Sequence, residues 1–155
     1  MLYHISKLKQ SEQELVRNVP ILVSILIAGS DGVIEKNEIE KALKTIHTKS
    51  FSETSDIRYL YKDIENNAEN AMNNMLKSLP EDHLEREAII TAELTKLNEI
   101  FPKLDKNIAI DFYKSLRNFA VQVANTSGGV LGVMKINYNE KEMLKLPMIK
   151  NPESE

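Results

Sequence analysis

The residues best suited to chemistry form an acidic turn at positions 31–38 (DGVIEKNE), directly after a long apolar run. Carboxylate oxygens are the ligands that calcium, magnesium and manganese prefer, so Asp31, Glu35 and Glu38 are candidate metal ligands. The same residues also have a purely structural interpretation. Asp-Gly is common in turns, and a glutamate in the first turn of a helix complements the helix dipole. Both interpretations place the turn between two helices.

The spacing of this turn matches an EF-hand calcium loop in part. With Gly32 at loop position 6, Asp31 falls at position 5 and Glu38 at position 12, as that loop requires. Positions 1 and 3 then fall on Ile27 and Gly29, which carry no side-chain oxygen. Calcium needs about six to eight oxygen ligands, so the sequence argues against an ordinary EF-hand sensor.

A second segment repeats the chemistry of the first. Residues 34–40 (IEKNEIE) and 136–142 (INYNEKE) each present an isoleucine, an asparagine able to cap a helix, and two glutamates. Each follows a long apolar segment and a glycine-containing turn. Two copies this far apart indicate two pseudo-repeated halves rather than a solenoid. The alternative is a chance similarity between two helix starts.

These two segments carry a resemblance to a known family. Residues 28–39 (AGSDGVIEKNEI), at the end of an apolar helix, resemble the TerB-like family of tellurite-resistance proteins. Residues 123–132 (VANTSGGVLG), followed by 139–142 (NEKE), resemble the second half-motif of some members, so the resemblance covers roughly residues 11–146. It implies an all-α fold of two related halves, a bacterial origin, a link to metal-oxyanion and stress responses, and a divalent-metal site on clustered acids.

Transferred onto this chain, the implied metal site comprises five acids: Asp31, Glu35, Glu38, Glu140 and Glu142. The cofactor implied is a divalent ion such as calcium, magnesium or manganese. The chain departs from the family pattern in its second turn, which has Val133 and Met134 where the first turn has an aspartate and a glycine. A metal ion would therefore be held mainly by the first half.

Composition narrows the class of protein. The chain has 155 residues, a common size for one domain, and 42% of them are hydrophobic. Lys+Arg (20) nearly balance Asp+Glu (23) without a long basic stripe, so no nucleic-acid partner is expected. Cysteine is absent, which excludes disulfides and thiolate zinc sites. This composition fits a reducing compartment, and we expect a cytoplasmic protein.

The apolar run at residues 19–28 (VPILVSILIA) has three interpretations. It is too short for a membrane span, which needs about 20 residues, so no integral membrane segment is expected. A cleaved signal peptide stays open as an alternative, but the run starts late and Glu12 and Glu14 precede it. We prefer a central helix that is buried on all sides.

Apolar spacing predicts an all-α, single-domain bundle of about six to eight helices, with residues 1–150 as the domain and 151–155 as a frayed polar tail. Helix starts are expected at capping patterns that begin at Ser11, Asn37, Ser50 and Asp105. A kink or break is expected at Pro20.

Further boundaries follow from turn residues. Asn66-Asn67 either separates two helices or lies within one, and Pro80 should open the next helix. Gly128 should end a long helix, and a short one should begin at Asn139 and end before Pro147.

Other candidate sites are weaker. His83 and Glu87 lie four residues apart and could form a metal or acid–base pair, although an exposed surface pair explains them as well. Residues 128–132 (GGVLG) lack the Lys-Ser/Thr ending of a phosphate loop. Three apolar residues near the C-terminus could form a partner surface: Met143, Met148 and Ile149.

Three hypotheses for function follow. The first is a non-enzymatic module in stress response or tellurite resistance that binds a divalent cation through the acidic turn. The second is an interaction or scaffolding domain with an unknown protein partner or a second copy, in which the turn is structural. The third is a small helical enzyme, for which the sequence offers no convergent set of titratable groups.

Overall fold

The computed structural model describes residues 2–30, 32–53, 55–127 and 138–154, apart from the side chains of residues 55, 126–127 and 138–140. All regular structure within these ranges is helical, as predicted. The elements are α1 (Leu2–Ile5), α2 (Gln10–Ala28), α3 (Lys36–Ser52), α4 (Ser55–Glu65), α5 (Ala68–Ser78), α6 (His83–Thr95), α7 (Leu97–Ile100), η1 (Phe101–Lys103), α8 (Lys106–Ser127), α10 (Tyr138–Leu144) and η3 (Pro152–Ser154).

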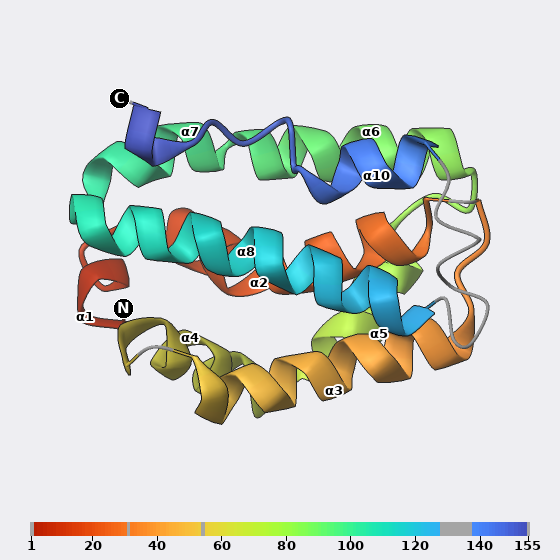
Figure 1. The fold of residues 1–155 in the computed structure, drawn as a ribbon, viewed down its shortest axis with the longest axis horizontal. Helices are drawn as coiled ribbons and strands as arrows, with labels where there is room; N and C mark the ends of the chain where they lie inside the picture. The colour runs from red at the N-terminus through yellow and green to blue at the C-terminus, as the bar shows by residue number, and fades with distance from the viewer. Residues whose placement is uncertain (1, 31, 54, 128–137, 155) are drawn as a thin grey trace.

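The helices form one bundle around α2. Figure 1 shows α2 and α8 across the middle, α6, α7 and α10 along one edge, and α3, α4 and α5 along the other. Helix α2 contacts α3, α5, α6, α8 and α10, so it joins both edges. The loop after α2 and the start of α6 lie at the same end of the bundle (Figure 1). This end holds the acidic turn.

Helix α2 is the buried central helix that its apolar run predicts. Every residue from Val19 to Ala28 is buried. Pro20 lies inside the helix, but α2 continues through it, so the alternative of a break is wrong. Proline removes one backbone donor. The buried Ser24 hydroxyl donates to the Pro20 carbonyl at 2.7 Å, so its hydrogen-bond partner lies within the same helix.

The apolar stripes predicted for the other helices face the core. In α8, Phe112 and Phe119 lie at helical spacing and have no exposed surface. In α4 the four apolar residues at helical spacing are all buried: Ile57, Leu60, Tyr61 and Ile64. Between α4 and α5, residues 66–67 separate two helices, which decides between the two readings of that pair. Periodicity of apolar residues is therefore enough to identify the core.

The predicted N-caps Ser11 and Asn37 are wrong because both helices begin before these residues. Helix α2 begins at Gln10 rather than after Ser11, and the Lys9 amide donates to Glu12 Oε2 at 3.0 Å. Helix α3 has Glu35 as its N-cap, two residues before Asn37.

The predicted capping box at Ser50 does not form, because α3 continues to Ser52 and the Ser50 hydroxyl donates to the His47 carbonyl at 2.6 Å. Helix α6 begins after Asp82, whose carboxylate accepts from the Glu85 amide at 2.9 Å, so Pro80 lies before the helix instead of opening it. The predicted cap at Asp105 is confirmed, since its Oδ1 accepts from the Asn107 amide at 2.9 Å.

The C-terminal segment is packed, contrary to the prediction that it frays. Asn98 holds it with both ends of its amide: Nδ2 donates to the Met148 carbonyl at 2.9 Å, and Oδ1 accepts from the Lys150 amide at 2.8 Å. Pro152 is buried within η3. Ile149 is 3% exposed, and Met143 and Met148 pack against the core. Ile149 is thus removed from the predicted partner surface, while Met143 and Met148 are half-buried and their part in such a surface stays a prediction.

The predicted pseudo-repeat of two halves stays a prediction, because residues 128–132 of its second motif lie outside the described residues. The apolar run at residues 130–136, the one segment of the sequence that could form a strand, also lies outside the described residues. Among the helices that the structure describes, none has the length and hydropathy of a membrane-spanning segment.

Candidate functional site at the acidic turn

The acidic turn begins where α2 ends in a tight backbone loop. The Gly29 amide donates to the Ile25 carbonyl at 2.8 Å, and the Gly32 amide donates to the Gly29 carbonyl at 2.9 Å. Gly32 has φ +94°, a conformation that residues with a Cβ rarely adopt. The chain then extends through Glu35 into α3. The geometry of the turn alone therefore explains the glycine at position 32.

The five predicted ligands lie in different environments. Glu38, in the first turn of α3, is 6% exposed and is the one that the structure shows as buried. Glu35 is exposed. Glu142 lies in α10, and its Oε1 is 3.1 Å from Lys145 Nζ. Asp31 and the side chain of Glu140 lie outside the described residues.

The structure does not gather these acids into one described cluster. Figure 1 places α3 and α10 on opposite edges of the bundle, with α2 and α8 between them. Among the described residues, no three metal-binding side chains come together. Glu35 and Glu38 on one side and Glu142 on the other therefore belong to different parts of the bundle.

Helix α6 packs against the turn through an arginine. Arg86 is 8% exposed, although arginine is rarely buried. A Cβ placed on Gly29 would lie 2.7 Å from Arg86 Nη2, so the guanidinium rests directly on this glycine. Arg86 Nη1 donates to the Glu81 carbonyl at 3.3 Å. A cation at this position also faces the C-terminal end of α2, where the helix dipole is negative.

His83 packs against the same turn one helical turn earlier. Its Nδ1 lies 3.5 Å from the position of a Cβ on Gly32. His83 and Glu87 line a small cleft between α2 and α6, but this cleft has no space for a water molecule. The predicted His83–Glu87 pair is thus present on one helix face, without a cavity in which a substrate or metal ion would fit. The arrangement gives no support to the enzyme hypothesis.

A buried polar cluster between α3, α4 and α8 was not predicted from the sequence. Lys49 is 2% exposed, and its Nζ forms an ion pair with Glu53 Oε1. The Ser115 hydroxyl donates to the same carboxylate oxygen at 2.9 Å and lies 3.1 Å from the Tyr61 hydroxyl. The Lys49 ammonium is 5.6 Å from the centre of the Tyr61 ring. We call these four residues the Lys49 cluster.

Burial dominates the electrostatics of the Lys49 cluster. Desolvation raises the pKa of Tyr61 well above its usual value, while the hydrogen bond with Ser115 lowers it by less. The phenol therefore stays neutral and acts as a hydrogen-bonding group. The sequence signal was the i,i+4 spacing of Lys49 and Glu53. Such pairs are common on surfaces, so the spacing alone does not reveal burial.

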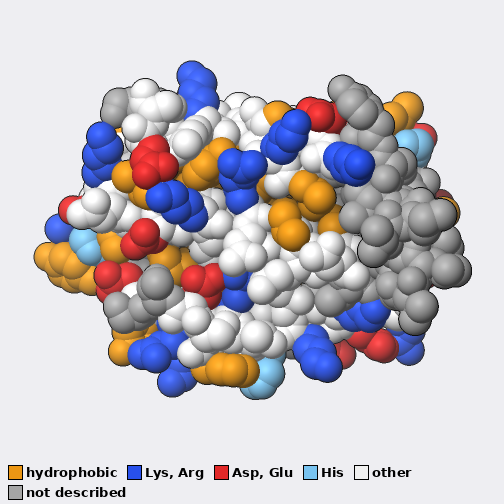
Figure 2. Space-filling model, in the orientation of Figure 1, with side chains coloured by type: hydrophobic (Ala, Val, Ile, Leu, Met, Phe, Trp, Pro, Cys, Tyr) orange, Lys and Arg blue, Asp and Glu red, His pale blue; other side chains and the backbone are white. Residues whose placement is uncertain are grey.

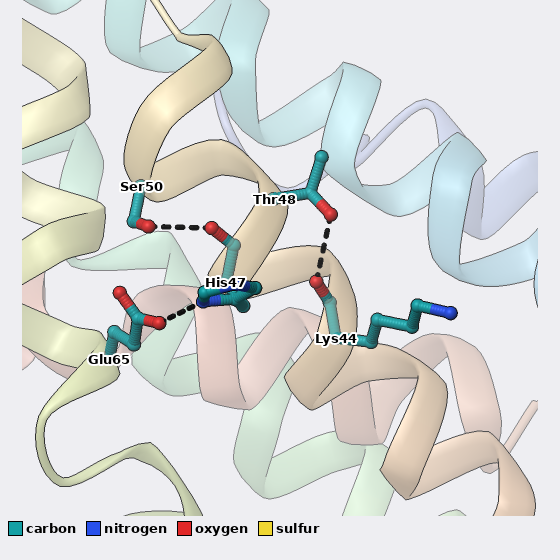
Figure 3. A network of polar contacts seen from close by, with 5 residues as sticks. All are labelled: Lys44, His47, Thr48, Ser50 and Glu65. Carbon is teal, nitrogen blue, oxygen red and sulfur yellow. Dashed lines mark hydrogen bonds and ion pairs between the residues drawn. The ribbon is translucent and has the colours of Figure 1, made fainter.

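A second polar contact joins α3 to α4 on the surface. Figure 3 shows His47 on α3 directed towards Glu65 at the end of α4, with Ser50 beside it. His47 Nδ1 contacts Glu65 Oε1. The hydrogen bond from His47 holds the pKa of Glu65 below its usual value. The imidazole side chain is 63% exposed, so this contact lies in water, unlike the Lys49 cluster.

Comparisons with known proteins identify no relative of this chain. No protein-family model, no curated protein and no solved structure matches the chain.

Proposed function

We propose that this protein is a non-enzymatic, TerB-like module of a stress response that binds a divalent cation at the end of the bundle where α2 meets α3. The proposal combines the resemblance of the turn motif to that family with one structural observation: the Glu38 carboxylate is buried in the first turn of α3. Glu38 is also one of the acids that the resemblance assigns to the metal site.

The burial of Glu38 supports a role as a ligand of a positive charge better than a role as an ordinary surface acid. A carboxylate that leaves water loses hydration free energy, and nearby donors or positive charge must offset that loss. The N-terminus of α3 supplies part of this positive potential. A bound calcium, magnesium or manganese ion would add more, with oxygen ligands from Glu38 and Asp31. The exposed Glu35 is the N-cap residue of the same helix, and it would be a further candidate oxygen ligand for this ion.

The test is thermal unfolding with and without each cation. Calcium, magnesium or manganese should raise the melting temperature of the chelator-treated protein, because a ligand that binds the folded state stabilises it. The double variant Asp31→Asn/Glu38→Gln should lose this rise. Glu69→Gln is the matched control, since Glu69 is an exposed acid in the first turn of α5. It should keep the full rise. A melting temperature that no cation changes would contradict the proposal.

One observation favours a second candidate, an interaction domain in which the turn is structural. The Arg86 guanidinium and the His83 ring occupy the space beside Gly29 and Gly32, so the turn already serves to dock α6 on α2. This candidate predicts no response to chelators, and a change of sedimentation with protein concentration or on addition of a partner. The same pair of measurements therefore separates the two candidates.

A further inference from the structure

A groove lies between α8 and the C-terminal segment, on the face shown in Figure 2. The residues that line it are far along the chain from the acidic turn. The volume of the groove is about 470 Å³, within the range of small-molecule sites. Its lining includes Tyr113, Lys114, Arg117 and Val121 from α8, and Leu144 and Lys145 from the α10 region. Figure 2 shows an apolar patch near the middle of this face, with Lys and Arg side chains along its upper border. By its lining, the groove combines apolar side chains with cations.

The charges in the groove differ from those of the whole chain. The chain carries a net charge of −3, yet three cations and one acid, Glu153, line the groove. Lys114 Nζ is 3.0 Å from Glu153 Oε1, so the groove already receives one carboxylate from the chain itself. That exposed pair shows that a cation of the groove can accept a carboxylate as its partner.

Arg117 is the cation that remains available. Its guanidinium lies 5.8 Å from the centre of the Tyr113 ring, which orients it by a cation–π contact. It forms no hydrogen bond or ion pair with another residue in the described parts of the chain. Arginine presents a planar set of donors that match a carboxylate or phosphate. Lys145 lines the same groove and has Glu142 as its exposed partner.

We propose that this groove binds a small amphipathic organic anion. Arg117 and Lys145 would hold its carboxylate or phosphate group, and Val121 and Leu144 would contact its apolar body. Val121 is 40% exposed, so covering it would remove apolar surface from water. This site uses none of the residues of the proposed metal site, and the two proposals stand or fall separately.

The experiment is an NMR titration of the full chain with octanoate and with octyl phosphate. Octanol is the uncharged control ligand, and vesicles of phosphatidylglycerol test whether the anion is instead a lipid headgroup. The variants are Arg117→Gln and Lys145→Gln. Arg58→Gln is the matched control, because the Arg58 guanidinium lies over the Tyr59 ring at 5.2 Å on α4 and does not line the groove.

Octanoate or octyl phosphate should shift the amide signals of residues 113–121 and 144–145, and octanol should shift them much less. Arg117→Gln should weaken binding about three- to tenfold, Lys145→Gln should weaken it less, and Arg58→Gln should leave it unchanged. Higher salt should weaken binding because the groove is open to solvent. The proposal would be overturned if these shifts were absent, if they spread through the core, or if octanol bound equally well. An unchanged affinity of Arg117→Gln, or binding to the vesicles alone, would also overturn it.

Discussion

The two ends of α3 each bury one charged side chain. Glu38 lies in the first turn with 6% exposure, and Lys49 lies in the last turn with 2%. Both signs match the helix dipole, which is positive at the N-terminus and negative at the C-terminus. The dipole alone is a small effect, typically below about 1 kcal/mol. Each end therefore needs further partners to offset the burial of a charge.

The two ends of α3 differ in how far the sequence reveals them. At the C-terminal end, Glu53, Ser115 and Tyr61 supply the partners, yet no sequence motif marks them. At the N-terminal end, a conspicuous motif marks the site, and its glycines have structural roles against α6. A motif therefore indicates where the backbone is constrained, whereas a buried ionic cluster becomes visible once the helices are packed.

The strongest test of this comparison removes one charge from the Lys49 cluster. Glu53→Gln leaves the Lys49 ammonium buried without its ion-pair partner, so we expect the free energy of unfolding to fall by about 2–4 kcal/mol. Urea denaturation at neutral pH measures the change. In the double variant Lys49→Met/Glu53→Gln, the buried charge is gone, and at least half of the loss should be recovered. A double variant as unstable as the single one would show that the ion pair is not the cause.

The next largest effect is expected at the acidic turn. Gly29→Ala places a Cβ 2.7 Å from Arg86 Nη2 and 3.0 Å from the Ile25 carbonyl oxygen. We expect a loss of about 1–3 kcal/mol, because a side chain or the end of α2 must move. The loss should shrink when Arg86→Ala is added, since part of the strain comes from the guanidinium. Equal losses in both backgrounds would place the whole strain at the Ile25 carbonyl.

The smallest effect concerns the exposed contact between His47 and Glu65. The folded-state pKa of Glu65 lies below its unfolded value of 4.5, so its contribution to stability is present above that value and is lost as the pH falls through the folded pKa. The stability difference between the wild type and Glu65→Gln should therefore be present at neutral pH and disappear in acid. Urea denaturation along a pH series measures it, and His47→Gln should reduce the same difference. A difference that persists in acid would contradict this assignment.

The fold could be predicted because the apolar residues at helical spacing are buried or pack against the core. The spacing of Ile57, Leu60, Tyr61 and Ile64 was enough to identify the inner face of α4, and all four are buried. Helix ends were harder, because several groups compete to cap each one. Asn37 is a good capping residue, but the extended backbone at Glu35 starts α3 earlier. The packed C-terminal segment depends on Asn98, fifty residues away, which no local pattern reveals.

The candidate site was predictable only in part. The turn lies between two helices, as expected, and Glu38 is buried beside it. The approach of Arg86 and His83 was missed, because His83 was considered with Glu87 on its own helix rather than with Gly32 across the bundle. The Lys49 cluster was missed for the same reason, since Ser115 lies on α8, far from Glu53 in the chain. Contacts between helices need tertiary packing, which apolar periodicity does not fix.

The central position of α2 limits how the chain can be divided. Helix α2, with its buried run from Val19 to Ala28, contacts α3 and α5, which follow it closely, and α6, α8 and α10, which lie much further along the chain. A fragment that ends near Pro80 would therefore keep α2 but leave one side of it uncovered. The remaining fragment would contain α6, α8 and α10 without the helix α2 against which they pack. The two pieces should acquire structure when they are mixed, as complementing fragments, and neither should behave as an independent folding unit.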